Sequence, residues 1–388
     1  GALAAGHIIE CGCQATGGNY AFFKEVPSFD NVGYPIAEIL EDGSFYITKH
    51  PDTGGLVSKG TVTAQLLYEI GSPAYINPDV ISHFDTLKIE DIEKDRVYVS
   101  GCRGSSPPKD HKVCINLSGG FRNGMEVILT GLDIEEKAEV FANALFNSVG
   151  GKNQFDEVSI QLHRTDKENP SSNEEAMASL VISVKSMDAE LVGRLFSAKI
   201  IELALANIPG FFAQGGVKSS GPVIVYWPAL IDSKHIKEVV HINDQEIEII
   251  PTSQMDFEDI YYQKEPIEIE EVEMKDEETI NFGDIYGTRS GDKGGCANLG
   301  VWAKNSKSFA FLIRYLSVDK LKELLPDLRD FSIDRYELAN INSLNFYIHD
   351  ILQDGVSSNN RKDGQAKSLG EYLRAKEIRV PKNLLEDQ

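Results

Sequence analysis

Residues 125–227 contain six predicted elements in the order strand, helix, strand, strand, helix, strand. The elements are MEVILTG (125–131), DIEEKAEVFANALFNSV (133–149), EVSIQLHR (157–164), ASLVISVKS (178–186), DAELVGRLFSAKIIELALAN (188–207) and PVIVYW (222–227). This order is the split βαβ, ferredoxin-like arrangement. We therefore expect a ferredoxin-like unit over about 125–227, with both helices on one face of an antiparallel sheet. Asp133, with Glu136 three residues later, and Asp188 are the expected helix caps.

The flanking sequence also mixes short strands with helices. Before the central unit, FYITK (45–49) and RVYVS (96–100) predict strands, and Val62, Leu66, Leu67 and Ile70 share one face of a predicted helix. After it, the pattern predicts helices in SVDKLKELLPDLR (317–329) and at 366–375, and a strand pair in IDRYELANI (333–341) and SLNFYIHDI (343–351). The expected fold class is α+β or mixed α/β.

An acidic segment separates the expected domains. Residues 256–279 contain 11 acidic and 2 basic side chains, as in an extended, solvated linker. The alternation in PIEIEEVEM also permits an edge strand protected by its charges. The predicted organisation is a main domain over 1–255, this linker over 256–279, and a C-terminal domain over 280–388.

Composition and charge exclude several classes of protein. With 60 acidic and 38 basic side chains, the net charge of −22 opposes binding to nucleic acid. The longest apolar stretch, around residues 222–231, is about half of the ~20 residues that a membrane-spanning helix needs, so we expect a soluble protein without a membrane partner. Five cysteines do not suggest a disulfide framework, and a cytoplasmic location is expected.

The first residues, GALAAGHIIECGC, do not resemble a secretory signal and read as the middle of a domain, which suggests that further sequence precedes them. Glu10 is a candidate catalytic acid or base, because a carboxylate in an apolar helix is costly unless it is bonded or functional. Cys11 and Cys13 lack the Cys-x-x-C spacing and the four ligands of a closed zinc site. We therefore expect no metal here, and two cysteines that pack as small apolar residues.

Two glycine-rich segments are candidate anion sites. Thr53, Gly54 and Gly55 precede the predicted helix and form a glycine loop that leads to its N-terminus. The segment TRSGDKGGCANLG has neither P-loop nor dinucleotide-binding spacing, but its glycine amides and cations can close on a phosphate or carboxylate. Its alternative is a surface hairpin whose charged residues lie in solvent. The candidate binding residues in this segment are Arg289, Ser290, Gly291, Asp292, Lys293, Gly294, Gly295 and Asn298. Lys367 belongs to a polar cluster before the last helix, where a simple helix cap is the alternative.

The chain resembles the acyclic terpene utilisation protein AtuA family over nearly its whole length. The motifs are GHIIECGCQATGG (6–18), the segment from Gly33 to Ile70, SGCRG (100–104), RSGDKGGCANLGVWA (289–303), LNFYIHDIL (344–352) and KDGQAKSLGEYL (362–373). The resemblance implies a C-terminal AtuA-like ferredoxin-fold domain after a large main domain. Relatives normally carry a substantial stretch before the first motif. Their usual RSGDKG motif continues with a polar pair, where this chain has Gly295 and Cys296.

The resemblance implies catabolism of branched acyclic terpenoids and a ligand of the branched or carboxylated acyl-CoA type. One hypothesis is an enzyme with lyase, hydratase or thioester chemistry, in which Glu10 transfers protons and the RSGDKGG segment holds an anion. The other is a non-catalytic binding or assembly subunit. An enzyme requires a second ionisable group near Glu10, whereas an assembly subunit requires an exposed apolar face on its C-terminal domain. No cofactor is expected, and the chain is expected to form a homo-oligomer or to assemble with another subunit.

Overall fold

The computed structural model describes residues 1–250, 254–256, 260 and 276–386. The chain forms two compact units. The first contains residues 1–114, 228–356 and 363–388, and the second contains 115–227 and 357–362. Both combine helices with antiparallel strands, which confirms the predicted fold class. The helices of the described residues include none that is long and apolar enough to cross a membrane.

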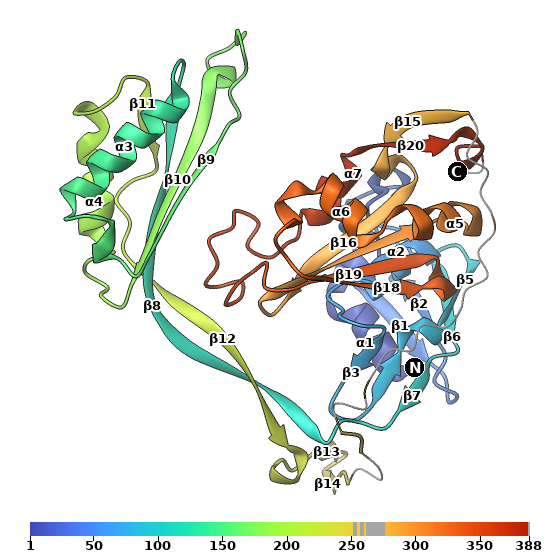
Figure 1. The fold of residues 1–388 in the computed structure, drawn as a ribbon. Coiled ribbons are helices and arrows are strands. Elements are labelled where there is room, and N and C mark those ends of the chain that lie inside the picture. The colour runs from blue at the N-terminus through green and yellow to red at the C-terminus, as the bar shows by residue number, and fades with distance from the viewer. Residues whose placement is uncertain (251–253, 257–259, 261–275, 387–388) are drawn as a thin grey trace. The chain divides into compact units, whose positions relative to one another are not determined.

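The second unit is built on one antiparallel sheet with the strand order β11-β8-β10-β9. Its elements are β8 (Asp110–Thr130), α3 (Ile134–Ser148), β9 (Glu157–His163), β10 (Met177–Ser186), α4 (Arg194–Glu202), β11 (Phe211–Gln214) and β12 (Gly221–Asp232). The first residues of β8 and the last of β12 belong to the other unit. Figure 1 shows α3 and α4 on the same face of this sheet. Phe141, Phe146, Phe196 and Ile200 from these helices share one core with Leu180 and its neighbours on the strands.

Several predicted details of this unit are wrong. The strand that follows α4 beside β8 is Phe211–Gln214, which pairs with Glu126–Leu129. PVIVYW lies in β12, which also pairs with β8 but off the main strand order. Both segments pair with β8, and the local pattern does not encode which of them takes the place beside Glu126–Leu129.

The predicted caps also differ from those observed. Asp133 precedes α3 in a left-handed conformation, with φ of 58°, and makes no side-chain capping bond. Asp188 Oδ1 accepts from the amides of Glu190 and Leu191, but this bond closes a turn, and α4 begins only at Arg194.

The N-terminal part of the first unit contains two small antiparallel sheets, β1-β2-β6-β5 and β3-β4-β7. The helices are α1 (Ala2–Glu10) and α2 (Lys59–Leu66), and the strands are β1 (Pro35–Ile39), β2 (Phe45–Lys49), β3 (Ala74–Ile76), β4 (Ile81–His83), β5 (Lys88–Glu93), β6 (Arg96–Ser100) and β7 (Arg103–Ser105). The predicted strands at 45–49 and 96–100 are confirmed. Ser58 caps α2 in a reciprocal capping box with Thr61.

The C-terminal part carries a second four-stranded antiparallel sheet, β16-β17-β19-β18. Its strands are β16 (Tyr286–Lys293), β17 (Cys296–Ala303), β18 (Ile333–Leu338) and β19 (Ser343–Ile348). Two further pairs of strands are β13 (Val239–Ile242) with β14 (Gln245–Glu248), and β15 (Glu277–Asn281) with β20 (Glu377–Pro381). The helices are α5 (Ser306–Tyr315), α6 (Val318–Leu324) and α7 (Leu369–Arg374). Most of the predicted linker lies outside the described residues, and its last three residues, 277–279, belong to β15.

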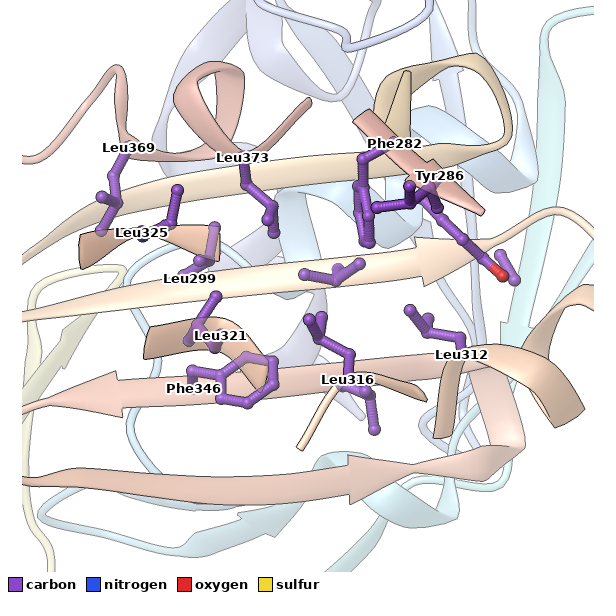
Figure 2. Close-up of a cluster of buried hydrophobic side chains, with 14 of the residues drawn as sticks. Phe282, Tyr286, Leu299, Leu312, Leu316, Leu321, Leu325, Phe346, Leu369 and Leu373 are labelled. Carbon is purple, nitrogen blue, oxygen red and sulfur yellow. The ribbon is translucent and has the colours of Figure 1, made fainter. Parts of the chain in front are cut away.

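One face of the C-terminal sheet is covered by helices. Figure 2 shows Leu312, Leu321 and Leu373 from these helices packed against Leu299 and Phe346 from the strands. All five side chains are fully buried. This face is therefore an ordinary apolar core, and the charged residues of the sheet must lie elsewhere.

A second core joins the beginning of the chain to its end. Trp302, Leu338 and Ile341 pack in the same apolar cluster as Ile8 and Leu67. The compact units therefore have different boundaries from the predicted domains, since the N-terminal and C-terminal regions share a core in the first unit.

Candidate active site

The segment predicted as a glycine loop is a strand pair. Arg289 to Lys293 lie in β16, the two-residue turn is Gly294–Gly295, and β17 starts at Cys296. Only the turn glycine Gly294 needs a left-handed conformation, with φ of +64°. Because side chains alternate along a strand, Arg289 and Lys293 share the face opposite the helix-covered core.

The end of α2 docks on this second face. A Cβ atom at Gly291 would lie 2.5 Å from Tyr68 Cε2, and one at Gly300 would lie 2.6 Å from Leu67 Cβ. The glycines in these strands thus permit close approach of the helix end rather than cradling an anion.

Asn298 connects the sheet to the chain just after α2. Its Nδ2 donates to Leu67 O at 2.6 Å and to Asn345 Oδ1 at 2.9 Å, while its Oδ1 accepts from the Glu69 amide at 2.8 Å. Glu69 itself is left-handed, with φ of 55°. Asn298 was predicted to bind a ligand, but here it is fully buried, bonded within the protein and holds the Glu69 backbone in place.

Carboxylates from three segments meet beside Lys367. The Lys367 ammonium lies 2.8 Å from Glu69 Oε1 and 3.4 Å from Asp292 Oδ1. One ligand atom each from Glu10, Cys11 and Glu69 lies within 4.8 Å of the others. Glu10 ends α1 and is exposed, so the predicted cost of burying its carboxylate does not apply.

Glu69 has the protonation behaviour of a general acid or base. Burial raises its pKa to about 7, and the nearby charges of Asp292 and Glu10 act in the same direction, whereas Lys293 lowers it. The Lys367 ion pair also favours the charged form. A carboxyl group with a pKa near 7 can give up or accept a proton at neutral pH.

Three cations lie over tyrosine rings in this site. The Arg289 guanidinium carbon is 4.3 Å and the Lys367 ammonium 4.5 Å from the centre of the Tyr68 ring, and the Lys293 ammonium is 5.3 Å from that of Tyr75. Burial lowers the pKa of all three cations. Within the described part of the chain, Arg289 and Lys293 form no ion pair or hydrogen bond through their side chains. The charges of Glu69, Glu10 and Asp292 act on Lys293 without forming an ion pair with it. Largely buried cations that lack a close partner are costly, which favours a site that receives an anion from a ligand.

The neighbouring histidine and thiol are neutral. Burial lowers the pKa of His7 to about 4, and its Nε2 lies 3.2 Å from Leu66 O. Burial and the adjacent carboxylate of Glu10 raise the pKa of Cys11 to about 12, and its thiol donates to Glu10 Oε1 at 2.9 Å. A thiol that resists ionisation is a poor nucleophile, so the carboxylates are the groups of this cluster that suit proton transfer.

The structure brings together five of the predicted site residues, namely Glu10, Arg289, Asp292, Lys293 and Lys367. Ser290 lies on the other face of β16, where its hydroxyl accepts from the Gly370 amide at 3.0 Å. A Cβ atom at Gly295 would lie 2.1 Å from Gln353 O, so that turn glycine is needed for packing.

The Thr53–Gly55 loop makes its contacts elsewhere. The amides of Gly54 and Gly55 donate to Asp30 O and Ser28 O at 3.1 and 2.7 Å, and the Thr53 hydroxyl donates to His50 O at 2.7 Å. These groups are bonded within the protein, and α2 begins beyond the loop, at Lys59.

Glu69 and Tyr68 were not predicted from the sequence. The available signal was the position of Glu69 just after the apolar run of α2. An acid at the C-terminal end of a helix opposes the helix dipole, so it needs a compensating cation, which Lys367 supplies from a distant segment.

Two sequence-family models match the chain. The sequence model described as acyclic terpene utilisation family protein AtuA matches residues 1–242, which is more than half of the chain. The chain belongs to the AtuA family. A second model, the AtuA ferredoxin-like domain, matches residues 280–379 of this AtuA-family chain and covers the sheet that carries Arg289 and Lys293. The family description supports a catabolic role. No curated protein and no solved structure gives a significant match.

Proposed function

We propose that this chain is an enzyme that acts on a branched or carboxylated acyl-CoA thioester in the breakdown of acyclic terpenoids, with Glu69 as its general acid or base. The proposal rests on the Glu69 carboxyl group, which has a pKa of about 7. This group lies near the cations Lys367, Lys293 and Arg289. Acid–base chemistry beside a thioester needs a group that changes its protonation near neutral pH and a positive charge for the developing oxyanion.

The position of each residue indicates which of these tasks it performs. Glu69 is partly buried and held by Asn298, so its carboxyl is the group that transfers the proton at the substrate. Glu10 is exposed, and it exchanges protons between Glu69 and solvent. Lys293 is largely buried without a carboxylate partner, and its ammonium stabilises negative charge on the thioester oxygen.

The same contacts support an enzyme over an assembly subunit. The required second ionisable group near Glu10 is present as Glu69. From residue 280 to the end of the described chain, Val356 and Tyr372 are the exposed large apolar residues, each with 37% of its surface accessible. Two such residues do not make the apolar face that an assembly subunit needs.

The test is turnover of two defined thioesters, isovaleryl-CoA and 3-methylglutaryl-CoA, across a range of pH. Glu69→Gln should lower kcat by about 100-fold or more, because it removes the proton-transferring group. With Glu69 acting as base, the rate should rise as the pH passes through about 7, and this dependence should disappear in the variant. Glu38→Gln is the matched control, since Glu38 is an exposed carboxylate on β1 that pairs with Arg96.

A folded Glu69→Gln protein with parental turnover and an unchanged pH profile would remove Glu69 from the mechanism. Failure of the parent chain to process any thioester, under conditions in which it binds them, would favour the non-catalytic alternative.

A further inference from the structure

A cavity lies along the free edge of β16 in the first unit, with a volume of about 210 Å³. β16 is the outer strand of its sheet, so one side of its backbone has no strand partner there. Thr288, Arg289 and Ser290 form one wall, Lys367 and the start of α7 form another, and the loop from Asn19 to Phe23 completes the lining.

Two polar atoms of the residues that line this cavity lack a hydrogen-bond partner in the described structure. Arg289 Nε and Thr288 Oγ1 are both inaccessible to solvent and have no hydrogen-bond partner in the described residues. The Arg289 guanidinium carbon lies 4.3 Å from the centre of the Tyr68 ring. A buried N–H without an acceptor is costly, and the terminal N–H groups of the same guanidinium match the two oxygens of a carboxylate.

The local acids do not neutralise this cation. Glu371 lines the cavity, but its two oxygens are held by Arg374 at 2.9 and 3.1 Å. The Glu69 carboxylate forms an ion pair with Lys367. Arg289 thus remains the cation of the cavity wall that lacks a carboxylate partner in the described structure.

The size of the cavity limits what it can hold. Pockets that enclose drug-sized ligands measure about 300–1,000 Å³, so a space of about 210 Å³ accommodates one end of a longer molecule. Tyr20, Ala21 and Phe23 add apolar surface, which suits a short hydrocarbon segment next to a charged end. A thioester-linked nucleotide is too large for this space.

We propose that this cavity binds the free carboxylate of the acyl chain, with Arg289 holding both oxygens and Lys367 adding a second positive charge. This inference rests on the proposed function, because it assigns one end of that substrate. It makes the chain selective for acyl groups with a carboxylate at the far end over acyl groups of the same shape without one.

The test is calorimetric binding of three small probes: isovalerate, its neutral isostere isovaleramide, and inorganic phosphate. Isovalerate should bind at least tenfold more tightly than the amide. Arg289→Met should weaken isovalerate binding by about ten- to a hundredfold, which corresponds to the loss of a charged hydrogen-bonded pair. Arg289→Lys should recover only part of the affinity, since it keeps the charge and loses the planar fork.

One control variant keeps the test interpretable. Arg379→Met is the matched control and should bind like the parent, because Arg379 is an exposed arginine on β20 paired with Glu277. The near-ultraviolet circular dichroism of each variant checks that it is folded.

Each outcome bears on the inference. Unchanged isovalerate affinity in folded Arg289→Met, equal affinity for the amide, or tighter binding of phosphate than of isovalerate would overturn it. Thioester turnover that ignores Arg289 would refute the inference alone. Arg289-dependent isovalerate binding without turnover of any thioester would refute the proposed function and leave the carboxylate site standing.

Discussion

The β8–β11 sheet and the C-terminal sheet are both antiparallel, yet their second faces differ in charge pairing. In each sheet one face packs against helices through an apolar core. On the second face of the β8–β11 sheet, Lys185 pairs with Glu157 at 2.6 Å and the Ser183 hydroxyl donates to Asn360 at 3.1 Å. On the second face of the C-terminal sheet, Arg289 and Lys293 lie over tyrosines without a carboxylate partner in the described residues.

This difference distinguishes charges that stabilise the fold from charges that are available to bind a ligand. A paired charge is satisfied when the chain folds, whereas a largely buried cation without a close ion pair can still bind an anion from outside the protein. The shared architecture therefore says little about activity, and the residues on one face of one sheet carry the chemistry.

The largest expected effect is on the free energy of unfolding, and it concerns the helix-covered faces that both sheets have. Leu299→Ala in the C-terminal sheet and Leu180→Ala in the β8–β11 sheet each remove a fully buried side chain from a helix-covered face. Each should lower the free energy of unfolding of its own unit by about 2–5 kcal/mol. Urea titration followed by hydrogen-exchange mass spectrometry measures each unit separately. A much smaller loss in one sheet would show that the two cores are not equivalent.

A smaller effect is expected where the second face meets α2. Gly300→Ala should cost about 1–3 kcal/mol, because its new methyl group would overlap Leu67, a buried residue close to Tyr68 and Glu69. The fluorescence of Trp302, which packs in the same core as Leu67, reports the unfolding of this region.

The control for this variant is Gly216→Ala, since no atom lies within 4 Å of the added carbon at that position. That substitution should leave stability nearly unchanged. A Gly300→Ala protein as stable as the parent would mean that the helix end is not tightly seated on the sheet.

Much of the fold could be read from local pattern. The alternation in FYITK and RVYVS predicts β2 and β6 to the residue, because each strand has one buried and one more accessible side. PVIVYW shows the limit of this reasoning. It is as apolar as a closing strand should be, but Phe211–Gln214 occupies that position beside β8.

The site depends on contacts that sequence patterns do not contain. Lys367 and Glu69 are 298 residues apart, and no local signal pairs them. Glycines in RSGDKGG indicate a turn when read locally, which is correct for Gly294. For Gly291 the reason is the approach of Tyr68, which is a tertiary contact.

The sharpest test of the comparison replaces one lysine on each second face by methionine, which keeps most of the side-chain volume and removes the charge. Burial lowers the pKa of Lys293, so the folded state holds that proton less tightly than the unfolded chain does. The charged form therefore costs stability at any pH below the folded-state pKa, including neutral pH. Lys293→Met should raise the free energy of unfolding by about 1 kcal/mol or leave it unchanged.

Lys185→Met should have the opposite sign. Its side chain is 12% exposed and its partner Glu157 is 41% exposed, so the substitution leaves a partly accessible carboxylate unpaired. A loss of about 1 kcal/mol is expected for a pair of this exposure, with no change in ligand affinity. Chemical denaturation at pH 7 measures both signs, and calorimetry with an acyl-CoA should show weaker binding only in Lys293→Met. Equal losses of stability, with equal affinities, would make Lys293 a structural cation like Lys185 and remove the reason for placing the site on this face.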